Sequence, residues 1–192
     1  MVHALIPDIS WPIAFAIGAV VAPPDAVAAT AIGRRIGLPR RIVTILEGES
    51  LLNDATALVA LRTALAATAV GVSAAGLTAD FLRAAGGGLL VGVLVFLVVA
   101  WVRQHIDDPL LDTGMSLVIP FAAYLLAEAE PIHGSGVIAV VVAGLLLGHK
   151  APIIQTAQSR IAERINWRTI AFLLENTVFL LIGLQARWIL GD

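Results

Sequence analysis

The sequence contains no cysteine among its 192 residues, so neither a disulfide nor a thiolate metal site can form. Charged residues are also scarce. They make up 14% of the chain, against about 25% in a typical soluble domain. The formal net charge of −2 indicates no basic surface, and we expect no nucleic-acid partner. The first residues lack a basic stretch before an apolar one, so no signal peptide is predicted.

Hydrophobic residues are abundant instead. They account for 59% of the chain, and the mean hydropathy is +0.93. These values predict an all-α polytopic membrane protein, with residues 1–192 forming a single transmembrane region and the lipid bilayer as its partner. Six apolar segments long enough or nearly long enough to span a bilayer occupy residues 11–32, 42–66, 81–102, 110–127, 136–148 and 165–188. A basic amphipathic connector is predicted at 153–164, lying along the membrane interface.

The first apolar segment is interrupted by two consecutive prolines, Pro23 and Pro24, followed by Asp25. Two prolines remove two backbone donors and clash with the preceding turn, so the helix must break there. Broken backbone at membrane depth needs protein or water to satisfy it. Its free carbonyls can ligate a cation, and a following half-helix can steady a carboxylate with its amide end. We therefore expect Asp25 and the Pro24 backbone near a mid-membrane ion site.

The second apolar segment carries an unusual group of polar residues near its middle. They are Glu47, Glu49, Ser50, Asn53 and Asp54. An ionised Asp at mid-membrane costs roughly 3 kcal/mol on insertion scales, so it is usually retained for a function. Ser50 and Asp54 are four residues apart and share a helix face. A carboxylate, a hydroxyl and an amide carbonyl are hard oxygen ligands that suit Na⁺, K⁺, Li⁺ or a proton rather than a transition metal.

Such a site can exchange two ions by competition. Low dielectric disfavours the charged form of a carboxylate, so the group tends to hold a proton, while a desolvated Na⁺ competes for the same oxygens. We expect Asp54, Asp25, Ser50 and Asn53 to bind the ion, with Asp54, Asp25 and Ser50 as Na⁺ ligands. The alternative is a structural acid that hydrogen-bonds to a neighbouring helix. Glu47 and Glu49 either ligate the ion or have a structural or gating role. Glu175 in the last segment either has a functional role or forms a helix–helix hydrogen bond.

Most of the 12 Lys and Arg residues fall in the loops after the first, third and fifth segments. The positive-inside rule then places those loops in the cytoplasm and both ends of the chain outside. The predicted location is the cell (inner) membrane, with multiple passes.

Four stretches together resemble the bacterial sodium/proton exchangers of the cation:proton antiporter superfamily. They are residues 21–30, 47–54, 136–148 and 175–184. The resemblance implies monovalent cation:proton antiport, with Asp54 binding either H⁺ or Na⁺ and with no cofactor beyond the transported ions. Asn53 stands where electrogenic relatives have a second Asp, which implies electroneutral exchange. Glu49 would pair with an arginine on a later helix.

The resemblance also has implications for the architecture. It implies a homodimer in which a mobile core moves against a fixed dimerisation domain, with residues 11–66 and 165–188 of core type and 81–148 of dimerisation type. Relatives have about twice as many spans, built as inverted repeats. We therefore expect the chain to be a fragment whose partner is the missing remainder of the transporter. Alternative functions are a non-transporting membrane fragment and an intramembrane aspartyl protease, although Pro-Asp and Asn-Asp here replace the Tyr-Asp and Gly-x-Gly-Asp motifs of such proteases.

Overall fold

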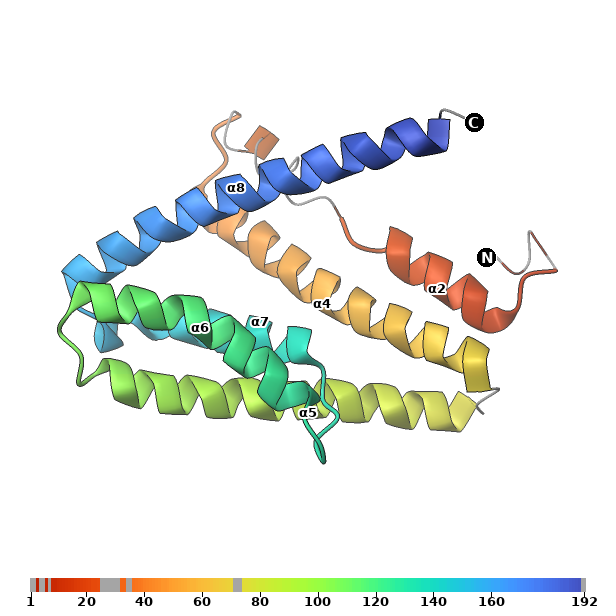
Figure 1. Cartoon of the computed structure of the whole chain (residues 1–192), viewed down its shortest axis with the longest axis horizontal. Coiled ribbons are helices and arrows are strands. Elements are labelled where there is room, and N and C mark those ends of the chain that lie inside the picture. The colour runs from red at the N-terminus through yellow and green to blue at the C-terminus, as the bar shows by residue number, and fades with distance from the viewer. Residues whose placement is uncertain are drawn as a thin grey trace. The chain divides into compact units, whose positions relative to one another are not determined.

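A computed structural model describes residues 3, 6, 8–24, 32–33, 36–70 and 74–190. Within these ranges the chain is helical and contains no strand. The numbered helices are α2 (Trp11–Val21), α4 (Arg40–Val70), α5 (Ala74–Arg103), α6 (Pro109–Glu128), α7 (Gly136–Ile154) and α8 (Ala157–Leu190) (Figure 1). The predicted all-α fold is confirmed.

Four stretches are long and apolar enough to cross a membrane. They are Thr78–Arg103, Pro109–Glu128, Gly136–Ile154 and Ala157–Ala186. The protein is therefore a membrane protein. The 31-residue α4 is also long enough, but it carries several charged side chains and is not among these four stretches. The first predicted segment is represented by the short apolar helix α2.

The predicted break in the first segment is confirmed. Helix α2 ends at Val21, and Pro23 and Pro24 follow in non-helical backbone. The last amide that closes the helix belongs to Ala22, which donates to the Gly18 carbonyl at 3.0 Å. The next two residues have no amide hydrogen to continue the pattern. Asp25, Arg34 and Arg35 lie outside the described residues.

The boundary between the fifth and sixth segments differs from the prediction. Helix α7 continues to Ile154, and α8 then runs unbroken for 34 residues, so the predicted connector and the last span form one helix. The physical reason is a cap at Thr156, whose Oγ1 accepts a hydrogen bond from the Ser159 amide at 3.1 Å. This cap starts a new helix at Ala157, eight residues before the predicted span.

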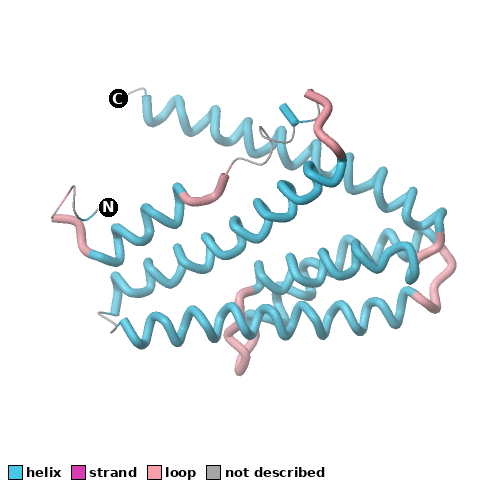
Figure 2. Tube along the Cα trace, turned by 180° about the vertical axis from the view of Figure 1, so that it is seen from behind, coloured by secondary structure: helices cyan, strands magenta, loops and turns pink. Residues whose placement is uncertain are grey.

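One compact unit comprises Met1–Phe96 and Pro120–Leu146. In it α2 packs along α4, and Figure 2 shows the two helices side by side from behind. Helices α5 and α7 approach closely where α5 has glycines. A Cβ on Gly92 would lie 2.8 Å from both the Ala139 carbonyl oxygen and the Val142 Cβ. The Gly88-x-x-x-Gly92 pattern thus marks a close helix contact.

The second unit comprises Leu97–Ile119 and Leu147–Asp192. It contains the end of α5, the start of α6, the end of α7 and all of α8. Trp167 on α8 donates from Nε1 to Ser116 Oγ on α6 at 3.1 Å. None of the most apolar window of α8 is buried. Such a helix is suited to contact lipid or further helices rather than water.

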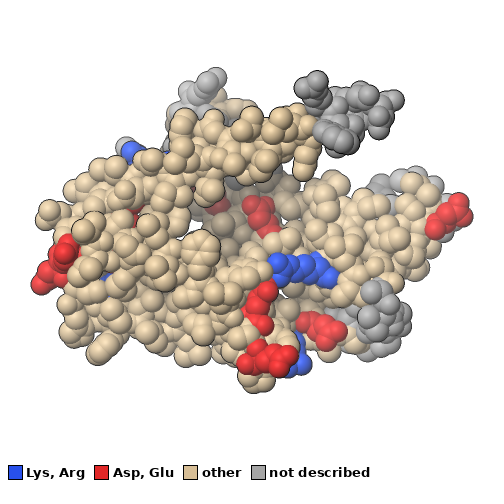
Figure 3. Space-filling view, in the orientation of Figure 1, with Lys and Arg blue, Asp and Glu red and all other residues tan. Residues whose placement is uncertain are grey.

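The surface is largely uncharged. Figure 3 shows one face on which charged side chains form small separate groups among uncharged residues. Large hydrophobic side chains are widely exposed, among them Leu90, Phe121 and Phe179. This exposure is what a bilayer requires of the groups that face it.

Candidate functional site

The central polar motif lies on α4, and its side chains differ in exposure. Ser50 is buried, with 3% of its surface exposed, whereas Glu47, Glu49, Asn53 and Asp54 are exposed. The helical spacing puts the Ser50 hydroxyl one turn before Asp54. The buried Ser50 hydroxyl thus packs against the rest of the first unit.

Ser50 contacts the broken end of the first segment. Its Oγ donates a hydrogen bond to the Pro24 carbonyl oxygen at 3.2 Å, joining residues 26 positions apart. The structure therefore brings together two of the predicted site residues, Ser50 and Pro24, and holds the residue before Asp25 against the polar turn of α4.

The break also leaves carbonyl oxygens without helical donors. In a continuous helix the amides of residues 23 and 24 would donate to the carbonyls of Ala19 and Val20, but prolines have no amide hydrogen. The carboxyl end of α2 also carries the negative end of the helix dipole. Carbonyl oxygens, a negative helix end and a nearby hydroxyl are together suited to a small cation.

Two of the remaining predicted residues lie outside the described part of the first unit. Asp25 lies outside the described residues, and Glu175 is exposed on α8, in the other compact unit. The next residue, Asn176, donates from Nδ2 to the Phe172 carbonyl of its own helix at 2.6 Å. Across the described ranges no three His, Asp or Glu side chains are grouped as a metal site.

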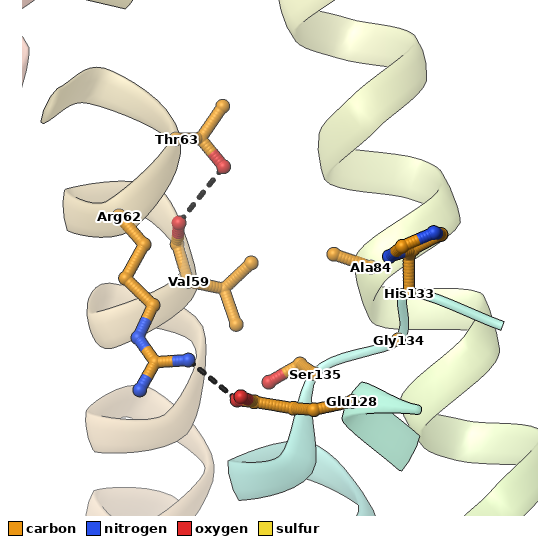
Figure 4. Close-up of a pocket in the computed structure, with 8 residues that line it drawn as sticks. All are labelled: Val59, Arg62, Thr63, Ala84, Glu128, His133, Gly134 and Ser135. Atoms are coloured by element: carbon orange, nitrogen blue, oxygen red, sulfur yellow. Dashed lines mark hydrogen bonds and ion pairs between the residues drawn. The ribbon is translucent and has the colours of Figure 1, made fainter. Parts of the chain in front are cut away.

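A second polar group in the first unit joins α4 to the end of α6. Arg62 Nη1 lies 2.6 Å from Glu128 Oε1, and Arg62 Nη2 donates to the Tyr124 hydroxyl at 3.0 Å. The side chains of Arg62 and Glu128 are 52% and 36% exposed. In Figure 4 these two side chains point toward one another across the mouth of a cavity.

This cavity has a volume of about 250 Å³ and lies between α4, α5 and the segment before α7. It is lined by Val59, Arg62, Thr63, Ala84, Glu128, His133, Gly134 and Ser135 (Figure 4). Its floor is tightly built. The Ser135 amide donates to the Ala84 carbonyl at 2.7 Å, and a Cβ on Gly134 would lie 2.7 Å from the Gly87 carbonyl carbon. Only glycine fits at such a backbone contact.

A third polar group lies in the second unit and is more deeply buried. Arg103 Nε lies 2.9 Å from Asp112 Oδ1, without the alignment of a hydrogen bond, and both side chains are 3% exposed. Arg103 Nη2 also donates to Glu163 Oε1 at 3.3 Å. Gln155 Nε2 donates to Asp112 Oδ2 at 2.8 Å and to Glu163 Oε2 at 2.5 Å. One residue from each of α5, α6 and α8, with Gln155 directly after α7, thus forms a polar cluster.

Sequence reasoning missed both of these groups. It used the Lys and Arg residues only to assign the sides of the membrane, and it gave no role to Asp112 or Glu128. One signal in the sequence could have indicated the buried cluster. Asp112 is an acid in the first turn of the apolar helix α6, and Arg103 lies in the last turn of the preceding helix, across a short loop. Partners separated by 60 or 66 residues, as in Arg103–Glu163 and Arg62–Glu128, leave no periodic pattern.

Comparison with known proteins identifies similar chains. A family model described as sodium/hydrogen exchanger, transmembrane, matches residues 1–191. An uncharacterised Na⁺/H⁺ exchanger of Mycobacterium tuberculosis is 40% identical over 171 residues, covering 88% of this chain and 31% of the relative. A sodium, potassium, lithium and rubidium/H⁺ antiporter of Bacillus pumilus is 38% identical over 192 residues, covering 96% of this chain and 28% of the relative.

A Na⁺/H⁺ antiporter of Halobacillus aidingensis is 33% identical over 186 residues, covering 94% of this chain and 46% of the relative. The chain therefore spans less than half the length of these curated relatives. The residues matched by the family model include the Ser50–Pro24 contact and both of the other polar groups.

Proposed function

The chain belongs to the sodium/hydrogen exchanger family, and from this premise we propose that it forms part of a secondary transporter that exchanges a monovalent cation, Na⁺ above all, for a proton. The observation that carries this proposal is the hydrogen bond from Ser50 to the Pro24 carbonyl, which holds the broken backbone against the acid-bearing turn of α4. A small desolvated cation needs several hard oxygen ligands close together, and this contact supplies a hydroxyl oxygen and a carbonyl oxygen.

In the proposed site Asp54 carries either the proton or the cation. Asp25, Ser50 and the carbonyl oxygens around Pro24 complete the Na⁺ ligands, and Asn53 contributes its amide oxygen or orients Asp54. Binding of the two ions is mutually exclusive because both use the same carboxylate. Asp54 is exposed in this chain, which supports an arrangement in which other segments of the whole protein cover that face of α4 and complete the site.

Electroneutral exchange of one cation for one proton follows from Asn53. An amide cannot release a proton in place of the second carboxylate that electrogenic relatives carry, so one proton fewer is available per cycle. K⁺ and Li⁺ are possible cargo as well, since the name of the Bacillus pumilus relative includes both.

The other acids have supporting roles in this proposal. Glu49 and Glu47 lie on exposed faces of α4, and Glu175 on α8 is exposed too. All three act as gating or structural acids, and Glu49 pairs with an arginine on a helix outside this chain. We place the protein in the inner membrane with its basic loops in the cytoplasm, as a homodimer when complete. Residues 11–66 and 165–188 belong to the mobile core and 81–148 to the dimerisation domain.

The test is Asp54→Asn in the natural protein that carries this chain, assayed in everted membrane vesicles by the dissipation of a preformed pH gradient on addition of NaCl. The substitution removes the titrating group at constant size, so sodium-dependent proton flux is expected to disappear. Asp80→Asn is the matched control, because Asp80 is an exposed carboxylate on α5 outside the motif. Retained flux in Asp54→Asn, with normal expression, would refute the proposed site.

A second candidate concerns the 192 residues by themselves. The chain covers 28% to 46% of the relatives compared, and Asp54 is exposed in it, which together favour a membrane segment that moves no ion on its own. Proteoliposomes made from these residues alone are expected to show no sodium-dependent proton flux. Measurable flux, absent in Asp54→Asn, would overturn this second candidate.

A further inference from the structure

Helix α8 is longer than a bilayer requires. Its 34 residues rise about 51 Å at 1.5 Å per residue, whereas the hydrocarbon core is about 30 Å thick. About 14 residues must therefore lie outside the hydrocarbon. The apolar residues concentrate toward the carboxyl end, so the surplus falls at the amino-terminal end of the helix, at residues 157–170.

One face of this amino-terminal stretch packs into the second unit. Ser159 is fully buried, Glu163 bonds to Arg103 and Gln155, and Trp167 bonds to Ser116. These three α8 residues follow an i, i+4, i+8 spacing and so lie on one side of the helix. The register of the helix against the rest of the unit is thus fixed by three polar contacts.

The register gives the outward surface a defined composition. Ile161, Ile165 and Phe172 lie opposite the packed face and are exposed. Arg160, Arg164 and Arg168 form a stripe beside them, again at i, i+4, i+8; Arg160 is half-buried and the other two are exposed. We call these three the arginine stripe. An apolar strip with a basic stripe beside it is the pattern of a helix at a membrane interface.

The charge of this surface is of one sign. Between residues 157 and 174 the sequence has a single acid, Glu163, and it points inward to Arg103. The arginine stripe therefore meets no acidic side chain on its own helix face. Successive arginines are about 6 Å apart along the axis, so the stripe extends over about 12 Å, which covers the headgroup layer beside the hydrocarbon.

We propose that the arginine stripe binds the phosphate groups of anionic phospholipids, while Ile161 and Ile165 lie among the headgroups and Phe172 lies among the upper acyl chains. A planar guanidinium pairs with phosphate through two parallel hydrogen bonds, and it stays charged at any physiological pH. Arg160 is held at the base of the stripe because its Nη1 donates to the Gln155 carbonyl at 3.0 Å. This proposal does not depend on which ion the protein exchanges.

The 192 residues contain no cysteine, so an introduced cysteine can report from one position within this chain. Ile161→Cys is labelled with bimane in the purified protein in detergent, and phosphatidylglycerol or phosphatidylcholine with a nitroxide on the upper acyl chain is titrated as a quencher. Each basic residue near a lipid surface contributes about fivefold in affinity, so phosphatidylglycerol should quench at a concentration at least tenfold lower than phosphatidylcholine. The preference should shrink in 1 M NaCl, where the Debye length is about 3 Å.

Variants identify the groups responsible. The triple substitution of Gln for Arg160, Arg164 and Arg168 should abolish the preference, and the triple Lys variant should keep most of it, which also shows that the labelled helix remains folded. Arg164→Gln should lower the preference about fivefold, whereas Arg83→Gln, an exposed arginine on α5, should leave it unchanged. Equal quenching by both lipids, an undiminished preference in the triple Gln variant, or displacement of the lipid by inorganic phosphate would each overturn the proposal.

Discussion

Arg103 is expected to be among the most sensitive charged residues of the chain. Its guanidinium contacts two carboxylates, those of Asp112 and Glu163, and its side chain is only 3% exposed. Arg103→Met keeps the bulk of the side chain and removes the charge. It leaves Asp112, which is 2% exposed, and Glu163 as two neighbouring carboxylates that share one amide from Gln155. Removal of one partner of a buried pair costs about 3–5 kcal/mol.

The same substitution at Arg62 provides the control. The Arg62 side chain is 52% exposed, and water screens its pair with Glu128, so Arg62→Met should cost no more than about 1 kcal/mol. The difference between two chemically identical changes, about 3 kcal/mol, isolates the effect of burial. The free energy of unfolding would be measured by titrating SDS into mixed micelles and following tryptophan fluorescence and helicity.

Two more variants test the reason for the cost. Glu163→Gln leaves a one-to-one pair of Arg103 with Asp112, and Glu163 is 22% exposed, so this change should cost about 1 kcal/mol or less. Adding Asp112→Asn to Arg103→Met removes the uncompensated carboxylate and should recover more than about 1 kcal/mol. An Arg103→Met cost equal to that of Arg62→Met, with no recovery in the double variant, would refute the reasoning.

Two further predictions concern the first unit. Gly88→Ala should destabilise the protein by about 1–3 kcal/mol, because its Cβ would lie 2.5 Å from the carbonyl oxygen just before α7. Gly86→Ala is the control: its Cβ would meet nothing within 4 Å, so the change should stabilise the protein by about 0.5–1 kcal/mol. SDS titration measures the free energy of unfolding of both variants. Ser50→Ala should lower the free energy of unfolding by about 1 kcal/mol and raise the Na⁺ concentration that gives half-maximal proton flux, because the bond to Pro24 is lost. The Thr56 hydroxyl bonds to carbonyls within its own helix turn, so Thr56→Ala should leave that concentration unchanged.

The features predicted correctly from the sequence are those with a local cause. The break before Asp25 follows from two missing amide hydrogens, and the shared helix face of Ser50 and Asp54 follows from their spacing of four residues. Both depend on covalent chemistry or on helical periodicity, which a sequence displays directly. Four of the predicted spans likewise appear as long apolar helices, because composition alone decides their hydropathy.

The features missed are those fixed by distant partners. The start of α8 depends on the Thr156 cap and on Glu163 reaching Arg103, so an amphipathic stretch that looked like a separate connector joins the last span. The proposed ion site was predicted from the sequence only in part. Periodicity placed Ser50 on the face of Asp54, and the structure shows the Pro24 partner of Ser50, while the role of Asp54 stays a prediction.

The interruption after α2 has a consequence for any cycle of movement. The pyrrolidine rings of Pro23 and Pro24 are permanent, so no rearrangement of neighbouring helices can restore the two absent amides. The carbonyls of Ala19 and Val20 thus lack their usual donors, the amides four residues later, in every conformation that the protein visits. If ions pass here, the oxygens that receive them are always present, and what changes with time is the side of the membrane from which water can reach them.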